Sequence, residues 1–293
     1  MASLDKIIYV LMSSQIDSSS VHQDEVAKAN QRFYDQIAKI YNKVDRRRGD
    51  HIDHSWVDRV FNNILSTLES TKVGTGELSF MDAASGSGFL AQRARIFFPR
   101  MTLLDISRNM LKEIDLPRAL KVCSDACFIP AKESSFDVIG GFATLHHLKS
   151  PKKFFQESYR ILRPGGIIYT DHDIESQFVN NFRPILWFYR KLFDHGKNYL
   201  KHCPESSEKD YLLSEYHGKE GLSGPKLAEQ LSEIGFQIRE VVYHWEGMGL
   251  AADFLQHFGL SGIFKRRGLA PVVRLIAVKP PGGDRRSKFR RRH

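Results

Sequence analysis

The fold is decided by the stretch Leu78-Ser79-Phe80-Met81-Asp82-Ala83-Ala84-Ser85-Gly86-Ser87-Gly88-Phe89-Leu90-Ala91. A short apolar run ends at Asp82, passes through a turn of small residues and opens into a segment with a helical pattern. At the carboxyl edge of a parallel sheet, this order turns the N–H groups of a helix N-terminus toward a ligand. The pattern G-x-G-x-x-A also fits a dinucleotide-binding turn, so the stretch alone predicts a nucleotide-type ligand without saying which.

Strand and helix patterns alternate after this stretch. Strands are expected at 78–82, 101–105, 119–123, 136–142, 166–172, 236–244 and 271–278. Helices are expected at about 88–97, 107–114, 151–162 and 224–234, with a short one near 250–258. Such alternation needs right-handed crossovers between parallel strands and helices on both faces of the sheet. The sequence therefore predicts an α/β fold with a doubly wound, mostly parallel sheet.

Composition divides the chain into a leader, one domain and a tail. Residues 1–22 are rich in serine and predict a flexible leader, followed by a folded domain over 23–279 that opens with helical spacing of apolar residues. Residues 175–222 interrupt the alternation with an aromatic helix and a polar loop, which predicts a helical lid insertion. Residues 280–293 are expected to form a disordered basic tail.

The formal net charge of +9 is concentrated at the C-terminus, where residues 285–292 hold six arginines and lysines. A short basic run is expected to be solvated, and its contact with an anionic membrane or RNA stays open as an alternative. No apolar run approaches the roughly 18 residues that cross a bilayer. We expect a cytoplasmic protein, with peripheral attachment to a membrane through the tail as the alternative.

Carboxylates follow three of the expected strands. Asp105 follows the glycine turn by about 20 residues, the separation at which an acid accepts hydrogen bonds from both hydroxyls of a ribose. Asp125 follows the third strand, where an acid and the next N–H group suit the edge of an adenine. Together with Asp82, these residues predict an adenosyl-type ligand along one edge of the sheet.

The blocks at 78–91, 101–111, 124–126, 136–148 and 160–166, in this order and spacing, resemble the class I S-adenosylmethionine-dependent methyltransferases. The resemblance is strongest to the type 11 group, which includes the ubiquinone- and menaquinone-biosynthesis methyltransferases. It covers 78–172 tightly and extends loosely to 33–41 and to the last two strands. It implies a Rossmann-like, seven-stranded sheet with an antiparallel last strand. It also implies an enzyme that moves a methyl group from S-adenosyl-L-methionine to a small-molecule acceptor by direct displacement.

The resemblance also implies roles for individual residues. The glycine turn would hold the methionine part of the cofactor, Asp105 the ribose hydroxyls and Asp125 the adenine amino group. The implied cofactor-binding residues are Asp82, Ala84, Gly86, Gly88, Asp105, Ile106, Asp125, Ala126 and Phe142. One position departs from the family pattern, because a glycine usually stands where this chain has Ala84, and a methyl group there restricts φ.

His146 and His147 follow the fourth strand, where the reacting methyl group would lie. One interpretation makes either histidine a general base, and the other makes both packing and capping residues. Methyl transfer from a sulfonium needs alignment more than proton transfer, so a catalytic base is not obligatory. Both interpretations stay open.

Three residues are expected in a lid over the acceptor: Tyr41 from the N-terminal helices, and His217 and Glu220 from a loop before a late helix. Aromatic residues at helical spacing over 182–193 fit a core stripe, an apolar acceptor pocket or an interfacial helix. A lid of this kind suits a quinone-like or lipid-like acceptor.

No metal is expected in this protein. The run Asp171-His172-Asp173 does not form a metal site if strand geometry is regular, because neighbouring side chains then point to opposite faces. Cys123, Cys127 and Cys203 lack metal-ligand spacing and are expected to be reduced thiols.

Two other functions fit parts of the sequence. A nicotinamide dehydrogenase would use the same glycine turn, but it would not require Asp125 or the block at 160–166. A protein that binds RNA or a membrane through its basic tail, on a methyltransferase-like scaffold, is the second alternative. Methylation of a base amino group is disfavoured, because Phe142-Ala143-Thr144-Leu145 replaces the Asn/Asp-Pro-Pro-aromatic block of such enzymes.

Overall fold

The computed structural model describes residues 7–8, 21–44, 54–70, 77–192, 201, 208–248, 252, 254, 257–260, 262 and 264–281. Most of the predicted leader, the basic run at 285–292, Cys203 and part of the short helix predicted near 250–258 lie outside the described residues.

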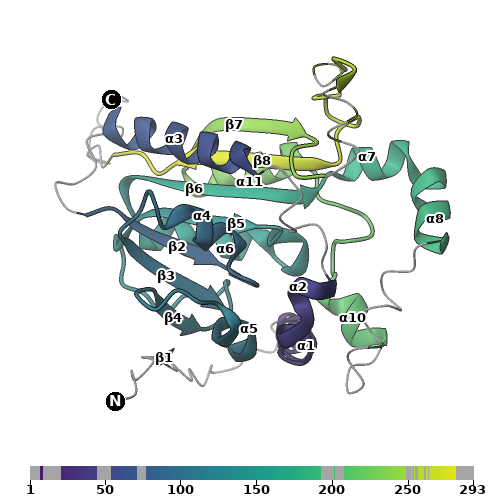
Figure 1. Ribbon diagram of the computed structural model, residues 1–293. Helices are drawn as coiled ribbons and strands as arrows, with labels where there is room; N and C mark the ends of the chain where they lie inside the picture. Colours follow the sequence, from purple (N-terminus) through teal and green to yellow (C-terminus); the bar gives the residue numbers. More distant parts are fainter. Residues whose placement is uncertain are drawn as a thin grey trace, which may run out of the picture.

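A single mixed sheet organises the chain (Figure 1). Its strands are β1 (Ile7–Ile8), β2 (Ser79–Ala83), β3 (Arg100–Asp105), β4 (Leu120–Cys123), β5 (Phe136–Phe142), β6 (Leu162–Ile174), β7 (Gln237–His244) and β8 (Val272–Val278). Their order is β1-β4-β3-β2-β5-β6-β8-β7, and β8 runs antiparallel to both β6 and β7. The predicted seven strands and the antiparallel last strand are confirmed, and a two-residue edge strand, β1, is added.

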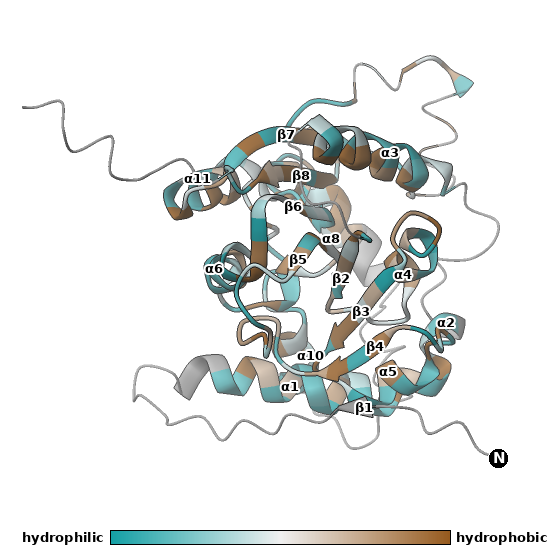
Figure 2. Cartoon of the chain, turned by 90° about the vertical axis from the view of Figure 1, so that its left-hand side faces the viewer, coloured by the Kyte–Doolittle hydropathy of each residue, from teal (hydrophilic) through white to brown (hydrophobic). Residues whose placement is uncertain are grey.

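Some of the described helices cover the two faces of this sheet, and others lie at its edge. The described helices are α1 (Val21–Ile37), η1 (Ala38–Ile40), α2 (Tyr41–Val44), α3 (Ser55–Ser70), α4 (Phe89–Ala94), α5 (Arg108–Glu113), η3 (Leu145–His147), α6 (Pro151–Ile161), α7 (Ser176–Asn181), α8 (Arg183–Leu192), α10 (Glu208–Ser214) and α11 (Gly224–Ile234). Helices α3, α4 and α5 lie on one face, and α6 and α11 on the other, as the view along the strands shows (Figure 2).

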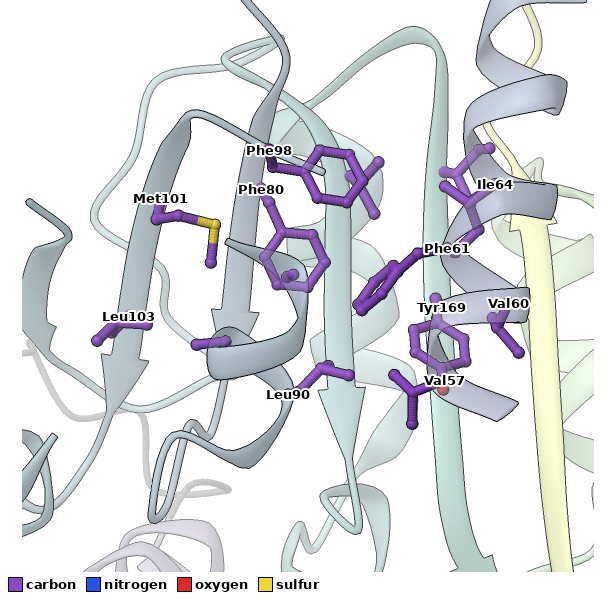
Figure 3. Close-up of a cluster of buried hydrophobic side chains, with 14 of the residues drawn as sticks. Val57, Val60, Phe61, Ile64, Phe80, Leu90, Phe98, Met101, Leu103 and Tyr169 are labelled. Carbon is purple, nitrogen blue, oxygen red and sulfur yellow. The ribbon is translucent and has the colours of Figure 1, made fainter. Parts of the chain in front are cut away.

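The core beneath α3 illustrates why the sequence folds this way. Apolar residues recur there at 57, 60, 61, 64 and 68, which places them on one face of a helix. Phe61 is fully buried, with its ring centroid 5.7 Å from that of Phe80 on β2 and 6.1 Å from that of Tyr169 on β6 (Figure 3). Burying one such side chain stabilises the fold by about 1.5–3 kcal/mol. This packing fixes α3 against the middle of the sheet.

The parallel strands end along one edge, and three left-handed backbone turns lie there. Ala84 follows β2 with φ of 54°, Ala143 follows β5 with φ of 52°, and His172 lies near the end of β6 with φ of 64°. Non-glycine residues rarely adopt this region, and such strain gathers at functional sites. At the carboxyl edge, the tertiary structure therefore holds these residues in backbone conformations that their side chains disfavour.

The remaining helices gather at the same edge. Helix α1 packs on α10 and α5, with the rings of Phe33 and Tyr211 5.6 Å apart (Figure 1). Helices α7 and α8 extend outward from the end of β6. None of the described helices combines the length and apolarity that crossing a bilayer would require.

Candidate cofactor and acceptor site

A cavity opens at the carboxyl ends of β2 to β5, between the sheet and α1. It encloses about 740 Å³ of empty space, part of it open to solvent. The strand order changes direction at β2, because β3 lies on one side of it and β5 on the other. In doubly wound sheets, ligands bind in the crevice at this point. Helix α1 supplies one wall through Val26, Ala27, Asn30 and Tyr34.

The cavity brings together most of the residues singled out from the sequence. Those that line it are Ala84, Gly86, Asp105, Ile106, Asp125, Ala126 and Phe142 of the cofactor set, with Tyr41 of the lid set and His147. They come from the ends of four strands and from an N-terminal helix, so only the folded chain assembles them.

Asp82 and Gly88 lie outside this lining and support the turn instead. The Asp82 Oδ2 atom accepts a hydrogen bond of 3.0 Å from the Ala91 N–H in the first turn of α4. Gly88 precedes α4 with φ of 78°, and a Cβ there would lie 2.8 Å from the Ile114 Cγ2 atom. The turn between β2 and α4 therefore needs an acid below it and a glycine beside Ile114.

Asp105 is a buried carboxylate held by two backbone donors. The Gly86 N–H lies 2.8 Å from Oδ2, and the Ser107 N–H lies 2.8 Å from Oδ1. Burial raises the pKa of Asp105 to about 6, against the opposing effect of these hydrogen bonds. Each carboxylate oxygen has a second lone pair, so the group has the capacity to accept two further hydrogen bonds from a ligand.

Asp35 ties α1 to the residues that follow Asp105. Its Oδ1 atom accepts hydrogen bonds from the Ser107 Oγ at 2.6 Å and from the Asn109 N–H at 3.1 Å. The Asn109 side-chain amide donates in return to the Asp35 carbonyl oxygen, at 3.0 Å. Sequence reasoning missed Asp35, although it lies in the 33–41 segment. Two features of the sequence point to this contact: an acid, Asp35, on the N-terminal helix, and the Ser107-x-Asn109 pattern at the start of α5.

Asp125, which is partly exposed, and the buried Cys127 are paired in the lining. The Cys127 N–H donates to the Asp125 Oδ1 over 2.8 Å, and burial raises the pKa of Asp125. Burial, followed by the charge of Asp125, also raises the pKa of the Cys127 thiol. Cys127 is therefore an unreactive thiol packed beside a carboxylate.

Aromatic rings hold Phe142 in place at the end of β5. Its centroid lies 4.3 Å from that of His172, nearly parallel to it, and 4.6 Å from that of Phe89. Trp56 also stacks on His172, with the centroids 5.0 Å apart, and its own centroid lies 6.2 Å from that of Phe142. The stack connects the cavity lining to a buried polar cluster behind it.

Asp171 is the centre of that buried cluster. The His244 Nε2 lies 2.8 Å from its Oδ1, and the Arg274 Nε donates to its Oδ2 over 2.6 Å. Burial alone would raise the pKa of Asp171, but the charges of Arg274 and His244 outweigh it and hold that pKa well below its ordinary value. Asp171 and Arg274 therefore form a buried ion pair, and the residues of the cluster come from three strands, β6, β7 and β8.

His172 departs from the regular strand geometry expected for this segment. Its left-handed φ and the register shift between Thr170 and Asp173 bring its Nδ1 within 3.0 Å of the Asp171 Oδ1. The expectation that these two neighbours face opposite sides is therefore wrong. Asp173 points elsewhere, toward His146.

The two histidines after β5 have different surroundings. The His146 Nδ1 and its own N–H lie 2.9 Å and 3.0 Å from the Asp173 Oδ1, so this imidazole is bound within the protein. The His147 Nδ1 instead faces the carbonyl oxygen of Ser214, while its Nε2 lies 3.4 Å from the Tyr34 hydroxyl. A carbonyl only accepts, so the hydrogen-bond network assigns the His147 proton to Nδ1 and a lone pair to Nε2.

Two sets of side chains bring possible metal ligands within 4.8 Å of one another: His146 with His147 and Glu215, and Asp171 with His172 and His244. In the second set, the Arg274 guanidinium beside Asp171 opposes a cation. In the first, the Nδ1 atoms of both histidines already face protein oxygens.

The remaining lid residues, His217 and Glu220, line a separate groove beside α6, α8 and α11. The loop that carries them is attached to η3, because the His217 N–H donates to the His146 carbonyl oxygen over 2.8 Å. Tyr41 and this loop thus border different spaces.

Residues 81–170 match a family model described as a methyltransferase domain. The matched segment runs from β2 into β6 and includes the strand ends that form the floor of the cavity.

Two curated relatives and one solved structure are similar to this chain. A probable S-adenosylmethionine-dependent methyltransferase of Mycolicibacterium smegmatis is 25% identical over 181 residues, which is 61% of this chain and 60% of that protein. A demethylmenaquinone methyltransferase of Chlamydia trachomatis is 28% identical over 143 residues, which is 46% of this chain and 58% of that protein. The chain spans about three-fifths of the length of these relatives.

The crystal structure of the cyclase SpnF superposes with a TM-score of 0.55 at 17% identity, covering 88% of this chain and 97% of SpnF. This likeness shows a shared fold over most of the chain.

Proposed function

We propose that the protein is an S-adenosylmethionine-dependent methyltransferase acting on a small acceptor of apolar, quinone-like or lipid-like character. The observation that carries the proposal is the buried Asp105 carboxylate, which faces the cavity and is held by the Gly86 turn. An acid in this position after the second strand of the Rossmann order suits the two hydroxyls of a ribose. The family match and the names of the relatives support the same cofactor.

The described residues fit an adenosyl cofactor in their chemistry. Asp105 has acceptor capacity for the ribose, Asp125 and the Ala126 N–H suit the adenine edge, and the Ala84–Gly86 turn suits the amino-acid end. Phe142 would border the sulfonium. S-adenosylmethionine, when bound, supplies an electrophilic methyl group. The protein's contribution is then to orient the acceptor in line with that group and to exclude water.

His147 is the residue best placed to take a proton from a hydroxyl acceptor. It lines the cavity, and the Ser214 carbonyl keeps the hydrogen on Nδ1, so that Nε2 has the lone pair. His146 is directed to Asp173 and serves the same segment as a structural residue. We therefore assign the general-base role to His147 when the acceptor is a hydroxyl or an activated carbon.

The character of the cavity wall supports an apolar acceptor. Val26, Tyr34, Tyr41 and Leu148 contribute largely apolar surface opposite the acids. The demethylmenaquinone methyltransferase among the relatives has, by its name, a quinone acceptor, which agrees with a wall of this kind.

Titration calorimetry with S-adenosylhomocysteine tests the proposal. Wild-type protein should bind it, and Asp105→Ala should lose about 1–3 kcal/mol of binding free energy through the missing charge-assisted hydrogen bonds. Asp115→Ala removes an exposed acid near the end of α5 and should leave binding unchanged. Equal binding by all three proteins, or preferential binding of NADH, would contradict the assignment.

A further inference from the structure

A second groove lies beside the cavity, between the first turns of α6 and α11 and the outer helices α7 and α8. It contains about 1630 Å³ of empty space, including space open to solvent. Five basic side chains line it: Lys149, Lys152, Arg183, Lys219 and Lys226. Glu220 is the acidic residue in its described lining. Basic side chains thus outnumber acidic ones in the described lining of the groove.

Two of these lysines have charges that the described part of the chain does not neutralise. Lys152 pairs with Glu233, whose Oε2 lies 2.6 Å from its Nζ. For Lys149 and Lys226, by contrast, the described residues supply no ion pair, and Lys149 is half-buried. A half-buried cation without a counter-ion favours an anionic ligand.

The helix starts add to this potential. Helices α6 and α11 both begin in the groove, at Ser150 and Ser223, and in the described chain neither serine makes a side-chain capping bond. Unpaired N–H groups at a helix N-terminus favour negative charge. The two helix starts therefore act in the same direction as the lysines.

The opposite wall of the groove is apolar. Leu186 and Trp187 of α8 line it, together with Val179 of α7. Trp187 is 62% exposed, and its indole adds apolar surface to this wall. A ligand with an acidic group and a hydrocarbon portion would satisfy both walls.

Lys149 links this groove to the first cavity, because it lines both. It follows η3, which holds His147, by two residues. A molecule that lies across Lys149 would therefore place one end near His147 and the other in the groove.

We propose that the groove binds the acidic group, a carboxylate or phosphate, of an amphipathic methyl acceptor whose reacting end lies in the first cavity. The acceptor role rests on the proposed function, whereas the binding of an amphipathic anion does not. Lys149 and Lys226 contact the acidic group, and the α8 wall contacts the hydrocarbon portion.

Fluorescence titration of Trp187 tests this with octyl phosphate as the probe, and Trp187→Phe protein supplies the background to subtract. Wild-type protein should bind octyl phosphate more tightly than 1-octanol or inorganic phosphate, and added salt should weaken the binding. Lys149→Gln and Lys226→Gln should each weaken it about threefold to tenfold. Lys132→Gln, before the amino end of β5, should change nothing.

Two results would overturn the proposal. One is equal affinity for octyl phosphate in wild-type, Lys149→Gln and Lys226→Gln proteins. The other is equal affinity of wild-type protein for octyl phosphate and for either 1-octanol or inorganic phosphate.

Calorimetry with S-adenosylhomocysteine on the same samples separates the two hypotheses. Lys226 lies outside the lining of the first cavity, so Lys226→Gln should retain full affinity for S-adenosylhomocysteine. If wild-type protein bound octyl phosphate as expected but not S-adenosylhomocysteine, the proposed function would fail and the anion groove would stand. The reverse result would remove the groove alone.

Discussion

The imidazole Nδ1 of His147 faces the carbonyl oxygen of Ser214 in α10, and its Nε2 lies beside the hydroxyl of Tyr34, another residue of the cavity wall. Its chain neighbour His146 is bound by the Asp173 carboxylate instead. Two adjacent histidines thus have different surroundings, because one is turned toward a backbone acceptor and the other toward an acid.

His147→Ala should slow methyl transfer about 10²–10⁴-fold for an acceptor that must lose a proton, since the base is removed. Affinity for S-adenosylhomocysteine should stay within about twofold. Single-turnover formation of S-adenosylhomocysteine measures the rate. Tyr34→Phe is the matched control, because it removes the hydroxyl near Nε2 and keeps the ring. A wild-type rate in His147→Ala would assign this histidine to packing.

His146→Ala should act on folding rather than on chemistry. Removing the imidazole leaves the buried Asp173 carboxylate without its side-chain donor, at a cost of about 1–3 kcal/mol in the free energy of unfolding. Urea denaturation measures this loss. A slowed rate with unchanged stability would reverse the roles assigned to the two histidines.

Binding of S-adenosylhomocysteine should weaken as pH falls below about 6. Burial raises the pKa of Asp105 to about 6, and only the ionised carboxylate accepts hydrogen bonds from both ribose hydroxyls. Below that pH, affinity should approach a tenfold loss per pH unit, measured by calorimetry between pH 5 and 7.5. Asp105→Asn should bind weakly with no such pH dependence, and a wild-type profile that is flat through this range would contradict the role of Asp105.

The same shift has the opposite sign for the stability of the ligand-free protein. Since the folded pKa of Asp105 exceeds that of the unfolded chain, the ionised group destabilises the fold. This penalty is absent below about pH 4 and complete above about pH 6. It amounts to about 3 kcal/mol for a shift from 3.8 to about 6. Asp105→Asn should therefore be more stable than wild type at pH 7, by urea denaturation, and nearly equal to it at pH 4.

Arg274→Met should destabilise the protein by about 3–5 kcal/mol, because it leaves the buried Asp171 carboxylate without its guanidinium. Lys152→Met breaks an ion pair of similar length at the surface and should cost less than about 1 kcal/mol. The pKa of Asp171 is depressed in the fold, so the stability it provides is present above about pH 4 and is lost at lower pH. Equal losses in the two variants, by urea denaturation at pH 7, would contradict a buried pair.

Ala84→Gly should leave the stability unchanged or raise it by up to about 1.5 kcal/mol. Relief of the left-handed φ gains about 1–2 kcal/mol, and the flexibility of glycine in the unfolded chain removes about 0.5–1 kcal/mol of it. Ala83→Gly, one residue earlier in the extended β2, should simply lose about 0.5–1 kcal/mol. Thermal or urea unfolding of the pair distinguishes the two backbone conformations, and a matching loss at both positions would mean that Ala84 is not strained.

The sheet and the floor of the cavity were predictable because their signals are local. Apolar runs that end in Asp105 or Asp125 mark strand ends, and the carboxyl ends of parallel strands must meet at one edge. The same reasoning assigned Asp82 to the cofactor set, although its carboxylate supports α4 beneath the turn. Sequence order does not reveal whether an acid at a strand end points into the crevice or under it.

The walls of the site could not be predicted, because they depend on packing between distant segments. Asp35 reaches Ser107 across 72 positions of the chain, and the Asn30 side chain donates to the His147 carbonyl across 117. No short motif encodes such pairs. The regular alternation expected for Asp171 and His172 was wrong for a related reason. His172, next to the ion pair of Asp171 with Arg274, has a left-handed backbone conformation that a strand pattern does not predict.

Helix α1 lies outside the 81–170 segment that matches the family, yet it closes one side of the cavity and is joined to α5 through Asp35. On the proposed function, substitutions on the cavity side of α1 would change which acceptor fits the cavity while the strand ends stay the same. Acceptor choice could then change without any substitution in the 81–170 segment.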